Sequence, residues 1–422
     1  MYNRSIRAAR RARFYNEAGD VRSMKTVAAI DFGTSKIVTL LADSGGFTRC
    51  DIIGSGTVPY DGYMDGGWNS PGQVLSAIRD SVAAAEVESK RRVTEVYVGV
   101  PCEYINILTA QSEVKISSED GRVSDDDIDK IQDAAADSLN IAARNVNVIH
   151  RSPAWFTIDD GRKTMSPIGV KGSVLKASVS FITAHPTFTS DIRAMLGQLG
   201  ITVLAFLSPA MGAALLLLPL DERDRAAVFI DIGYLNTEFS VVEGDAITYH
   251  AVIPMGGGHI SSDLAQTLEI NMRPAEQIKR DFIFTPDEFD IEGDPEVRFE
   301  NGASVTFPRA FVQRTVVATV NELADMLLLT LKDAAPKLSP RSQVFLTGGG
   351  LAMMRGGREY LAERLGKPIK TPIPRAAKLN SPKYASSLGL IDLIFDSIDQ
   401  QSQREDSIAN RLSDGIKNLF TR

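Results

Sequence analysis

Val27-Ala-Ala-Ile-Asp-Phe-Gly-Thr-Ser-Lys36 is an apolar run that ends in an Asp-x-Gly turn, and the same pattern returns at Ala226-Ala-Val-Phe-Ile-Asp-Ile-Gly-Tyr-Leu-Asn236. A second apolar run follows each turn, at 37–41 and 239–242. Apolar runs rich in β-branched residues on both sides of a short glycine turn predict a β-hairpin. Two distant copies of one hairpin indicate an internal duplication.

Helical segments follow the strands in both halves of the chain. Apolar residues recur at helical spacing over 70–85, 261–269 and 314–332, which predicts helices that cover the sheets. Hairpins combined with such helices indicate an α/β fold of two duplicated halves around a cleft. The segment 93–184 lies between them. It contains a strand-like run at 95–100, a helix that begins after a Ser124 cap, and two strands near 146–156 and 174–182, which predicts an inserted strand-helix-strand-strand module.

Composition limits the class of protein. The 422 residues are enough for two or more domains, and the net charge of -7 argues against broad attraction to nucleic acid. Cys50 and Cys102 have no metal-ligand spacing and the four histidines are scattered, so we expect neither a zinc site nor a disulfide. The longest apolar run, 210–218, is shorter than the roughly 20 residues of a membrane span and predicts a buried helix.

The first turn carries groups that suit phosphate oxygens. Backbone N–H groups, two hydroxyls and an ammonium lie close together in Asp31-Phe-Gly33-Thr34-Ser35-Lys36, and the Asp31 carboxylate can hold magnesium through water. Taken alone, the four-residue pattern Asp-x-Gly-Thr is also found in ordinary turns. The second copy at Asp231, together with a buried strand that ends in three glycines at 348–350, favours a nucleotide gripped between the halves.

Taken in order, the motifs resemble the actin, sugar-kinase and seventy-kilodalton heat-shock superfamily, and within it the FtsA family of bacterial cell-division proteins. The resemblance extends over about 26–396 and returns at the carboxyl end. Beside the turns, it rests on Gly54-Ser-Gly-Thr-Val-Pro59, Val96-Tyr-Val-Gly-Val100, Pro167-Ile-Gly-Val-Lys-Gly172, Asp221-Glu-Arg-Asp224, Ile253-Pro-Met-Gly-Gly257, Ala275-Glu-Gln-Ile-Lys279, Leu346-Thr-Gly-Gly-Gly350 and Ser381-Pro-x-Tyr-Ala-x-x-x-Gly389.

The resemblance implies that ATP or ADP binds in the cleft with Mg²⁺. The residues it implies for the nucleotide are Asp31, Gly33, Thr34, Ser35, Lys36, Asp231, Gly233, Asn236, Thr237, Gly256, Gly257, Glu276, Lys279, Gly348, Gly349 and Gly350. Asp31 and Asp231 would hold the metal through water. Glu276 and Lys279, three residues apart on one helical face, would reach the nucleoside; taken alone, that pair reads as a solvated ion pair.

One departure from the family pattern concerns hydrolysis. The family commonly has Asp-Ile-Gly-Gly-Gly-Thr-Thr-Asp, whereas this chain has Asp231-Ile-Gly-Tyr-Leu-Asn-Thr-Glu238. Tyr234 and Leu235 restrict the backbone where two glycines would let a phosphate approach. We therefore expect ATP binding with weak or absent hydrolysis, and we assign no catalytic residue.

The carboxyl end has an amphipathic pattern. After a polar linker at 397–406, the segment 407–422 gathers five bulky apolar residues on one helical face, namely Ile408, Leu412, Ile416, Leu419 and Phe420. A helix with such a face after a flexible linker is typical of a segment that lies in a membrane interface. A terminal helix docked on the body is the alternative. The FtsA family ends in a membrane-targeting helix, so the resemblance favours the membrane.

These inferences predict a domain order and a function. The expected segments are a basic arm (1–23, with Met24 as an alternative start), a first actin-like subdomain (24–92 and 185–220), the inserted module (93–184), a second actin-like subdomain (221–258 and 330–396), a smaller subdomain (259–329), the linker and the terminal helix. The resemblance implies that the protein polymerises head to tail and binds the FtsZ carboxyl-terminal tail through the smaller subdomain. It also implies that the protein works with other division proteins and tethers FtsZ to the inner face of the cytoplasmic membrane at the division site. A PilM-like pilus scaffold and a small-molecule kinase of the superfamily are the alternatives.

Overall fold

The computed structural model describes residues 25–399, apart from 46–49, 61–62, 65–66, 69, 286–292, 299–301, 303 and 377–378. The predicted basic arm and the five predicted membrane residues lie outside the described residues. So does the predicted linker from 400 onward, whereas 397–399 still belong to the last described helix, at 385–399. We call this helix of residues 385–399 the carboxyl-terminal helix; it is separate from the terminal helix predicted at 407–422.

Two five-stranded sheets share one topology. The first has the order β10-β6-β1-β2-β3, and the second has the order β13-β12-β11-β16-β17. In each sheet the first three strands in sequence pair antiparallel and the next two add in parallel. The first sheet consists of β1 (Thr26–Phe32), β2 (Lys36–Ser44), β3 (Cys50–Pro59), β6 (Glu95–Gly99) and β10 (Thr202–Leu207); the second consists of β11 (Ala227–Ile232), β12 (Thr237–Glu243), β13 (Ala246–Ile253), β16 (Val344–Thr347) and β17 (Ile369–Lys370). The predicted duplication is confirmed.

Helices cover the sheets as the periodicity predicts. The first half has α2 (Pro71–Ser89), α4 (Pro186–Gln198), α5 (Pro209–Leu217) and the short α6 (Leu220–Arg223); the second has α7 (Gly257–Thr267), α8 (Met272–Asp281), α9 (Arg309–Ala334) and α10 (Gly357–Leu365). Two small hairpins, β4 (Tyr63–Met64) with β5 (Gly67–Trp68) and β14 (Glu296–Arg298) with β15 (Ser304–Thr306), complete these halves. The prediction that the helix of 261–269 starts at Ser261 is wrong, because α7 already begins at Gly257, after the extended residue Gly256.

The inserted module has the predicted order but a different first strand. It consists of β7 (Ile105–Lys115), α3 (Asp125–Ser138), β8 (Asn147–Ile158) and β9 (Val174–Ala184), with the sheet order β7-β9-β8. Ser124 caps α3 in a capping box with Asp127, as predicted. The assignment of the run at 95–100 to the module is wrong: it forms β6, which lies between β1 and β10 in the first sheet. Its buried Val96 and Val98 suit a central strand of that sheet.

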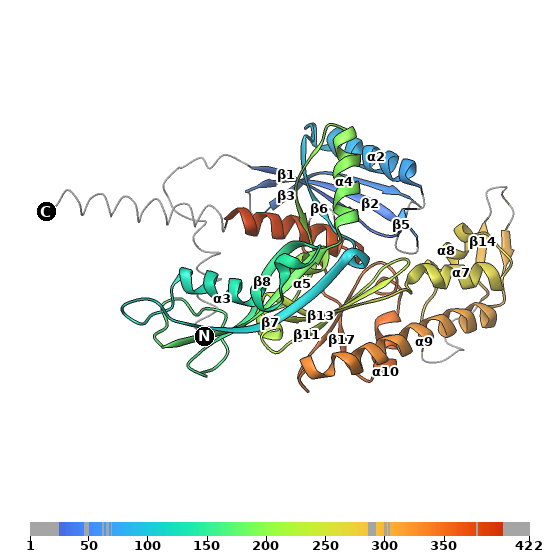
Figure 1. The fold of residues 1–422 in the computed structure, drawn as a ribbon. Helices are drawn as coiled ribbons and strands as arrows, with labels where there is room; N and C mark the ends of the chain where they lie inside the picture. The colour runs from blue at the N-terminus through green and yellow to red at the C-terminus, as the bar shows by residue number, and fades with distance from the viewer. Residues whose placement is uncertain are drawn as a thin grey trace.

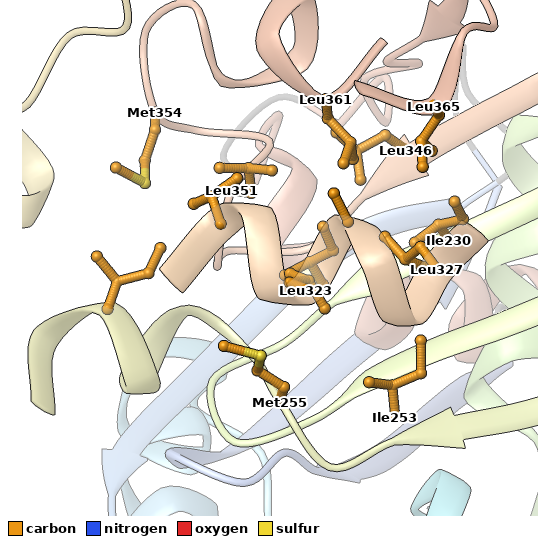
Figure 2. Close-up of a cluster of buried hydrophobic side chains, with 14 of the residues drawn as sticks. Ile230, Ile253, Met255, Leu323, Leu327, Leu346, Leu351, Met354, Leu361 and Leu365 are labelled. Carbon is orange, nitrogen blue, oxygen red and sulfur yellow. The ribbon is translucent and has the colours of Figure 1, made fainter. Parts of the chain in front are cut away.

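A buried core joins α9 to the second sheet. Figure 2 shows Leu323 and Leu327 of α9 near Ile230 of β11 and Leu346 of β16. All four side chains are buried, and complete burial of one such side chain stabilises the fold by roughly 1.5–3 kcal/mol. This packing fixes the ends of β11 and β16, where the second turn and the glycines at 348–350 begin.

Two helices cross where the halves meet. The carboxyl-terminal helix, red in Figure 1, lies between the sheet of the first half and the second half. Its Gly389 touches Gly212 of α5: a Cβ on Gly389 would lie 2.2 Å from the backbone nitrogen of Ala213. The apolar run at 210–218 is therefore the buried helix that was predicted, since α5 buries most of its length. Within the described residues, no helix has the length and apolarity that a membrane crossing needs.

Candidate functional site

The two Asp-x-Gly turns have the same backbone and touch each other. Gly33 N donates to Lys36 O at 3.0 Å, and Gly233 N donates to Asn236 O at 2.9 Å. The two halves then meet through a hydrogen bond from Leu235 N to Thr34 Oγ1 at 3.0 Å. The duplicated turns thus face each other at the junction of the halves. We call residues 31–36 the first turn and residues 231–236 the second turn.

One helix holds the carboxylates of both turns. Ser387 Oγ donates to Asp31 Oδ2 at 2.6 Å, and Ser386 Oγ donates to Asp231 Oδ2 at 3.0 Å. The two serines are adjacent near the start of the carboxyl-terminal helix. Neither serine was predicted from the sequence, because a single Ser-Ser pair in a helix has no pattern that links it to residues 155 and 356 positions away.

Glycines let the other segments pack against the second turn. Gly348 has a φ of +93°, and a Cβ there would lie 2.3 Å from Asp231 Oδ1. Gly350 N donates to Ile232 O at 2.8 Å, and Gly257 N donates to Gly233 O at 2.9 Å. A side chain at Gly348 would need both a left-handed backbone and the space that the carboxylate fills. The structure therefore places Gly348 against Asp231, and Gly350 and Gly257 against the neighbouring backbone of the second turn.

Lysine supplies the positive charge of the first turn. Lys36 Nζ lies 3.5 Å from the carbonyl oxygen of Lys383 and 4.6 Å from the ring centroid of Tyr384. Burial and the nearby Lys383 lower the pKa of Lys36, against the opposing effect of Asp31. The Lys36 ammonium has three N–H donors, so it can bind an anion in addition to the Lys383 carbonyl oxygen.

The predicted pair Glu276 and Lys279 on α8 is more enclosed than a surface ion pair. Lys279 is buried, and its Nζ donates to Glu276 Oε2 at 2.6 Å and to Gly257 O at 3.0 Å. It also lies 5.7 Å from the ring centroid of Tyr234. Lys279 therefore joins α8 to the glycines of α7 and to the second turn, which rules out the solvated ion pair for the described structure.

Two further residues predicted for the site, Asn236 at the end of the second turn and Thr237 just after it, bond elsewhere in the protein. Thr237 is buried and its hydroxyl donates to Met255 O at 2.7 Å. The Asn236 side-chain amide donates to Glu103 Oε1, a residue that was not predicted for the site. Glu103 lies in the short 3-10 helix η1 (Cys102–Tyr104) that follows β6. Since β6 is parallel to β1, its end lies at the same sheet edge as Asp31, which brings Glu103 to the second turn.

Several carboxyl groups share this junction. Desolvation raises the pKa of Asp31 and of Glu103, and desolvation followed by repulsion from Glu238 raises the pKa of Asp231 to about 7. The described residues contain no cluster of three or more His, Cys, Asp or Glu side chains that could hold a metal directly. Mg²⁺ in proteins commonly keeps several water ligands and is held through one or two carboxylates.

A pH dependence of stability follows from Asp231. Because its folded-state pKa of about 7 lies above the ordinary value of Asp, its proton stabilises the fold at low pH, and this stabilisation is lost as pH rises through about 7. We expect Asp231→Asn, which mimics the protonated group, to be more stable than the unaltered protein at pH 8. The difference between the unfolding free energies of the two proteins should shrink as pH falls below 7, by up to about 1.4 kcal/mol per pH unit. Urea unfolding at several pH values measures it, and a gap that does not change with pH would contradict the raised pKa.

Sequence comparisons place two family models on this chain. The model for cell division protein FtsA matches residues 228–389, and the model for the SHS2 domain inserted in FtsA matches residues 103–183. Together the matched segments cover more than half of the chain. Among curated proteins, cell division protein FtsA of Neisseria meningitidis is 26% identical over 88% of this chain and 90% of its own length. That of Escherichia coli K12 is 25% identical over 94% of this chain and 96% of its own length.

Solved structures support the fold assignment. The PilM-PilN type IV pilus biogenesis complex contains a chain that matches with a TM-score of 0.61 and 16% identity, over 87% of this chain and 98% of that one. MreB5 of Spiroplasma citri bound to AMPPNP matches with a TM-score of 0.51 and 13% identity, over 90% and 99%. At such identities the likeness establishes the fold alone, which confirms the predicted actin-like architecture.

Proposed function

Because the chain belongs to the FtsA family of cell-division proteins, we propose that it binds ATP with Mg²⁺, self-assembles, and tethers FtsZ to the cytoplasmic membrane. The observation that carries the nucleotide part is the junction of the two turns, where Asp31 and Asp231 accept hydrogen bonds from two adjacent serines of one helix and Thr34 Oγ1 accepts from Leu235 N.

The residues present fit a magnesium nucleotide. Thr34 and Ser35 offer hydroxyls and a tight turn, and Lys36 offers an ammonium, which are groups that bind phosphate oxygens. Asp31 and Asp231 offer carboxylate oxygens to the water ligands of Mg²⁺. Desolvation and, after it, repulsion from Glu238 raise the pKa of Asp231, and a bound Mg²⁺ would favour its ionised form. Gly348 and Gly350 pack directly against the second turn, and Gly349 between them has only Lys383 Cβ near its Cβ position, at 3.3 Å.

The second turn supports binding more than hydrolysis. Tyr234 is packed against α7, since a Cβ on Gly258 would lie 2.9 Å from the Tyr234 ring. Gly258 N donates to Tyr234 O at 2.6 Å, so this part of the turn is already engaged within the protein. We therefore propose a nucleotide-binding protein with slow or absent turnover, and we name no catalytic residue.

Membrane attachment rests on the segment 407–422. We expect deletion of this segment to abolish sedimentation of the purified protein with liposomes, because the five apolar residues of its predicted helical face are lost together. Leu412→Glu should weaken sedimentation strongly, since it puts a charge on that face. Asn418→Glu adds the same charge on the polar face and serves as the matched control. Unchanged pelleting of the deletion protein would refute the tether.

Binding of the FtsZ tail separates the division role from the alternatives. We expect the purified full chain to be retained on beads that carry a peptide of the FtsZ carboxyl-terminal tail, and not on beads that carry a scrambled peptide. A small-molecule kinase or a pilus scaffold of the same fold would not distinguish the two peptides. Equal retention on both kinds of bead, or on neither, would contradict the proposed partner. The smaller subdomain, predicted at 259–329, is the segment we propose for this contact.

A further inference from the structure

The hydroxyls of Ser386 and Ser387 make hydrogen bonds that the carboxyl-terminal helix does not need for its own backbone. Serines at helix starts usually accept from the first backbone N–H groups, and serines inside helices usually donate to the carbonyl four residues earlier. Ser397 of the same helix does so, because its hydroxyl donates to Leu393 O at 2.9 Å. Ser386 and Ser387 instead donate to carboxylates from the two opposite halves of the molecule.

The second oxygen of each carboxylate faces a glycine. A Cβ on Gly99 would lie 3.4 Å from Asp31 Oδ1, and a Cβ on Gly348 would lie 2.3 Å from Asp231 Oδ1. Each carboxylate therefore has Oδ2 bonded to a serine hydroxyl. Asp231 Oδ1 also occupies space that a side chain at position 348 would fill, whereas a Cβ at Gly99 would make only an ordinary contact with Asp31 Oδ1. The serine bonds thus restrict the rotation of both carboxylates, and Gly348 restricts Asp231 further.

The same element fixes both groups at once. Ser387 is 2% exposed, and Gly389 seats the helix directly on α5 of the first half. The helix cannot slide far without a backbone clash, so the two serines hold Asp31 and Asp231 in a constant relation across the junction. Hydrogen bonds that orient the groups which carry a cation typically affect its affinity strongly.

We propose that Ser386 and Ser387 are positioning residues, which orient Asp231 and Asp31 to receive a hydrated divalent cation. This inference deepens the proposed nucleotide function and rests on it for the source of the cation. The pair assigns a second task to the carboxyl-terminal helix: it joins the halves and also sets the geometry of the metal-binding carboxylates.

Calorimetry of ATP binding to the full chain tests the proposal. We expect Ser386→Ala and Ser387→Ala each to lower the affinity about tenfold in Mg²⁺, as for loss of a hydrogen bond to a charged group, and less than about twofold in EDTA. Ser386→Thr keeps the hydroxyl and should restore binding. Ser397→Ala, on the same helix, should bind as the unaltered protein does.

Two results would overturn the proposal. Unchanged affinity of both alanine variants in Mg²⁺ would mean that the serines position nothing, and equal losses in Mg²⁺ and EDTA would mean general structural support. If the unaltered chain does not bind Mg²⁺-ATP, the proposed nucleotide function fails, and Mn²⁺ alone becomes the probe, with water proton relaxation as the readout. Weaker Mn²⁺ binding in the alanine variants would then still support the positioning role; absent or serine-independent Mn²⁺ binding would overturn it as well.

Discussion

Gly348→Ala is expected to destabilise the protein by about 3–5 kcal/mol and to abolish ATP binding. Gly348 has a φ of +93°, which an alanine adopts only with strain. Its new methyl group would also lie 2.3 Å from both Asp231 Oδ1 and the carbonyl oxygen of Ile232. Both are fixed, since the carboxylate is bonded to Ser386 and the carbonyl to Gly350 N. Urea unfolding measures the loss of stability, and calorimetry measures the loss of binding.

Gly349→Ala is the matched control for that substitution. A Cβ on Gly349 would meet only the Cβ of Lys383, at 3.3 Å, and Gly349 lacks the positive φ of Gly348. A side-chain neighbour on the surface can move by a few tenths of an ångström, so we expect a cost of about 1 kcal/mol or less. Equal effects of the two substitutions would show that the site depends on glycine content alone and not on the contact with Asp231.

The contrast between these two glycines illustrates what the sequence leaves open. The run at 348–350 is three identical residues, and the sequence predicts only that the backbone there must be approached closely. Which glycine faces Asp231 depends on the parallel pairing of β11 with β16, two strands more than a hundred residues apart. Local patterns do not encode that register, because it is set by side-chain packing across the whole second half.

The duplicated hairpins were predictable for the opposite reason. β1 with β2 and β11 with β12 are local pairs joined by short turns, so the apolar runs and the Asp-x-Gly signal lie together in the sequence. From them followed the α/β class, the two halves and the meeting of the turns. The run at 95–100 was misplaced because a short apolar strand has no mark that tells which of two sheets it joins.

The partners of the carboxylates were invisible for a related reason. Ser386, Ser387 and Glu103 are common residue types without a distinctive local pattern, and each bonds to a residue from a distant segment. The carboxylates themselves stand out, because they precede a glycine turn after a buried strand. Residues that interrupt an apolar pattern are therefore easier to find in a sequence than those that support them from another element.

Gly389→Ala is expected to destabilise the protein by about 1–3 kcal/mol and to weaken ATP binding in the same preparation. The added methyl group would lie 2.2 Å from Ala213 N and 2.4 Å from the carbonyl carbon of Gly212. Both atoms belong to the backbone of the buried helix α5, so only a shift of the whole carboxyl-terminal helix relieves the clash. That shift would carry Ser386 and Ser387 away from the two carboxylates. Urea unfolding and calorimetry measure the two effects.

Gly197→Ala makes the same chemical change in α4, where a Cβ would meet nothing within 4 Å. An alanine in an open helical position reduces the conformational entropy of the unfolded chain, so this variant should gain about 0.4–1 kcal/mol. The two substitutions are thus expected to change stability in opposite directions. If Gly389→Ala were as stable as Gly197→Ala, the two crossing helices could separate freely. The halves of the molecule would then depend on the turns alone to stay in register, and the serine pair could not hold both carboxylates at once.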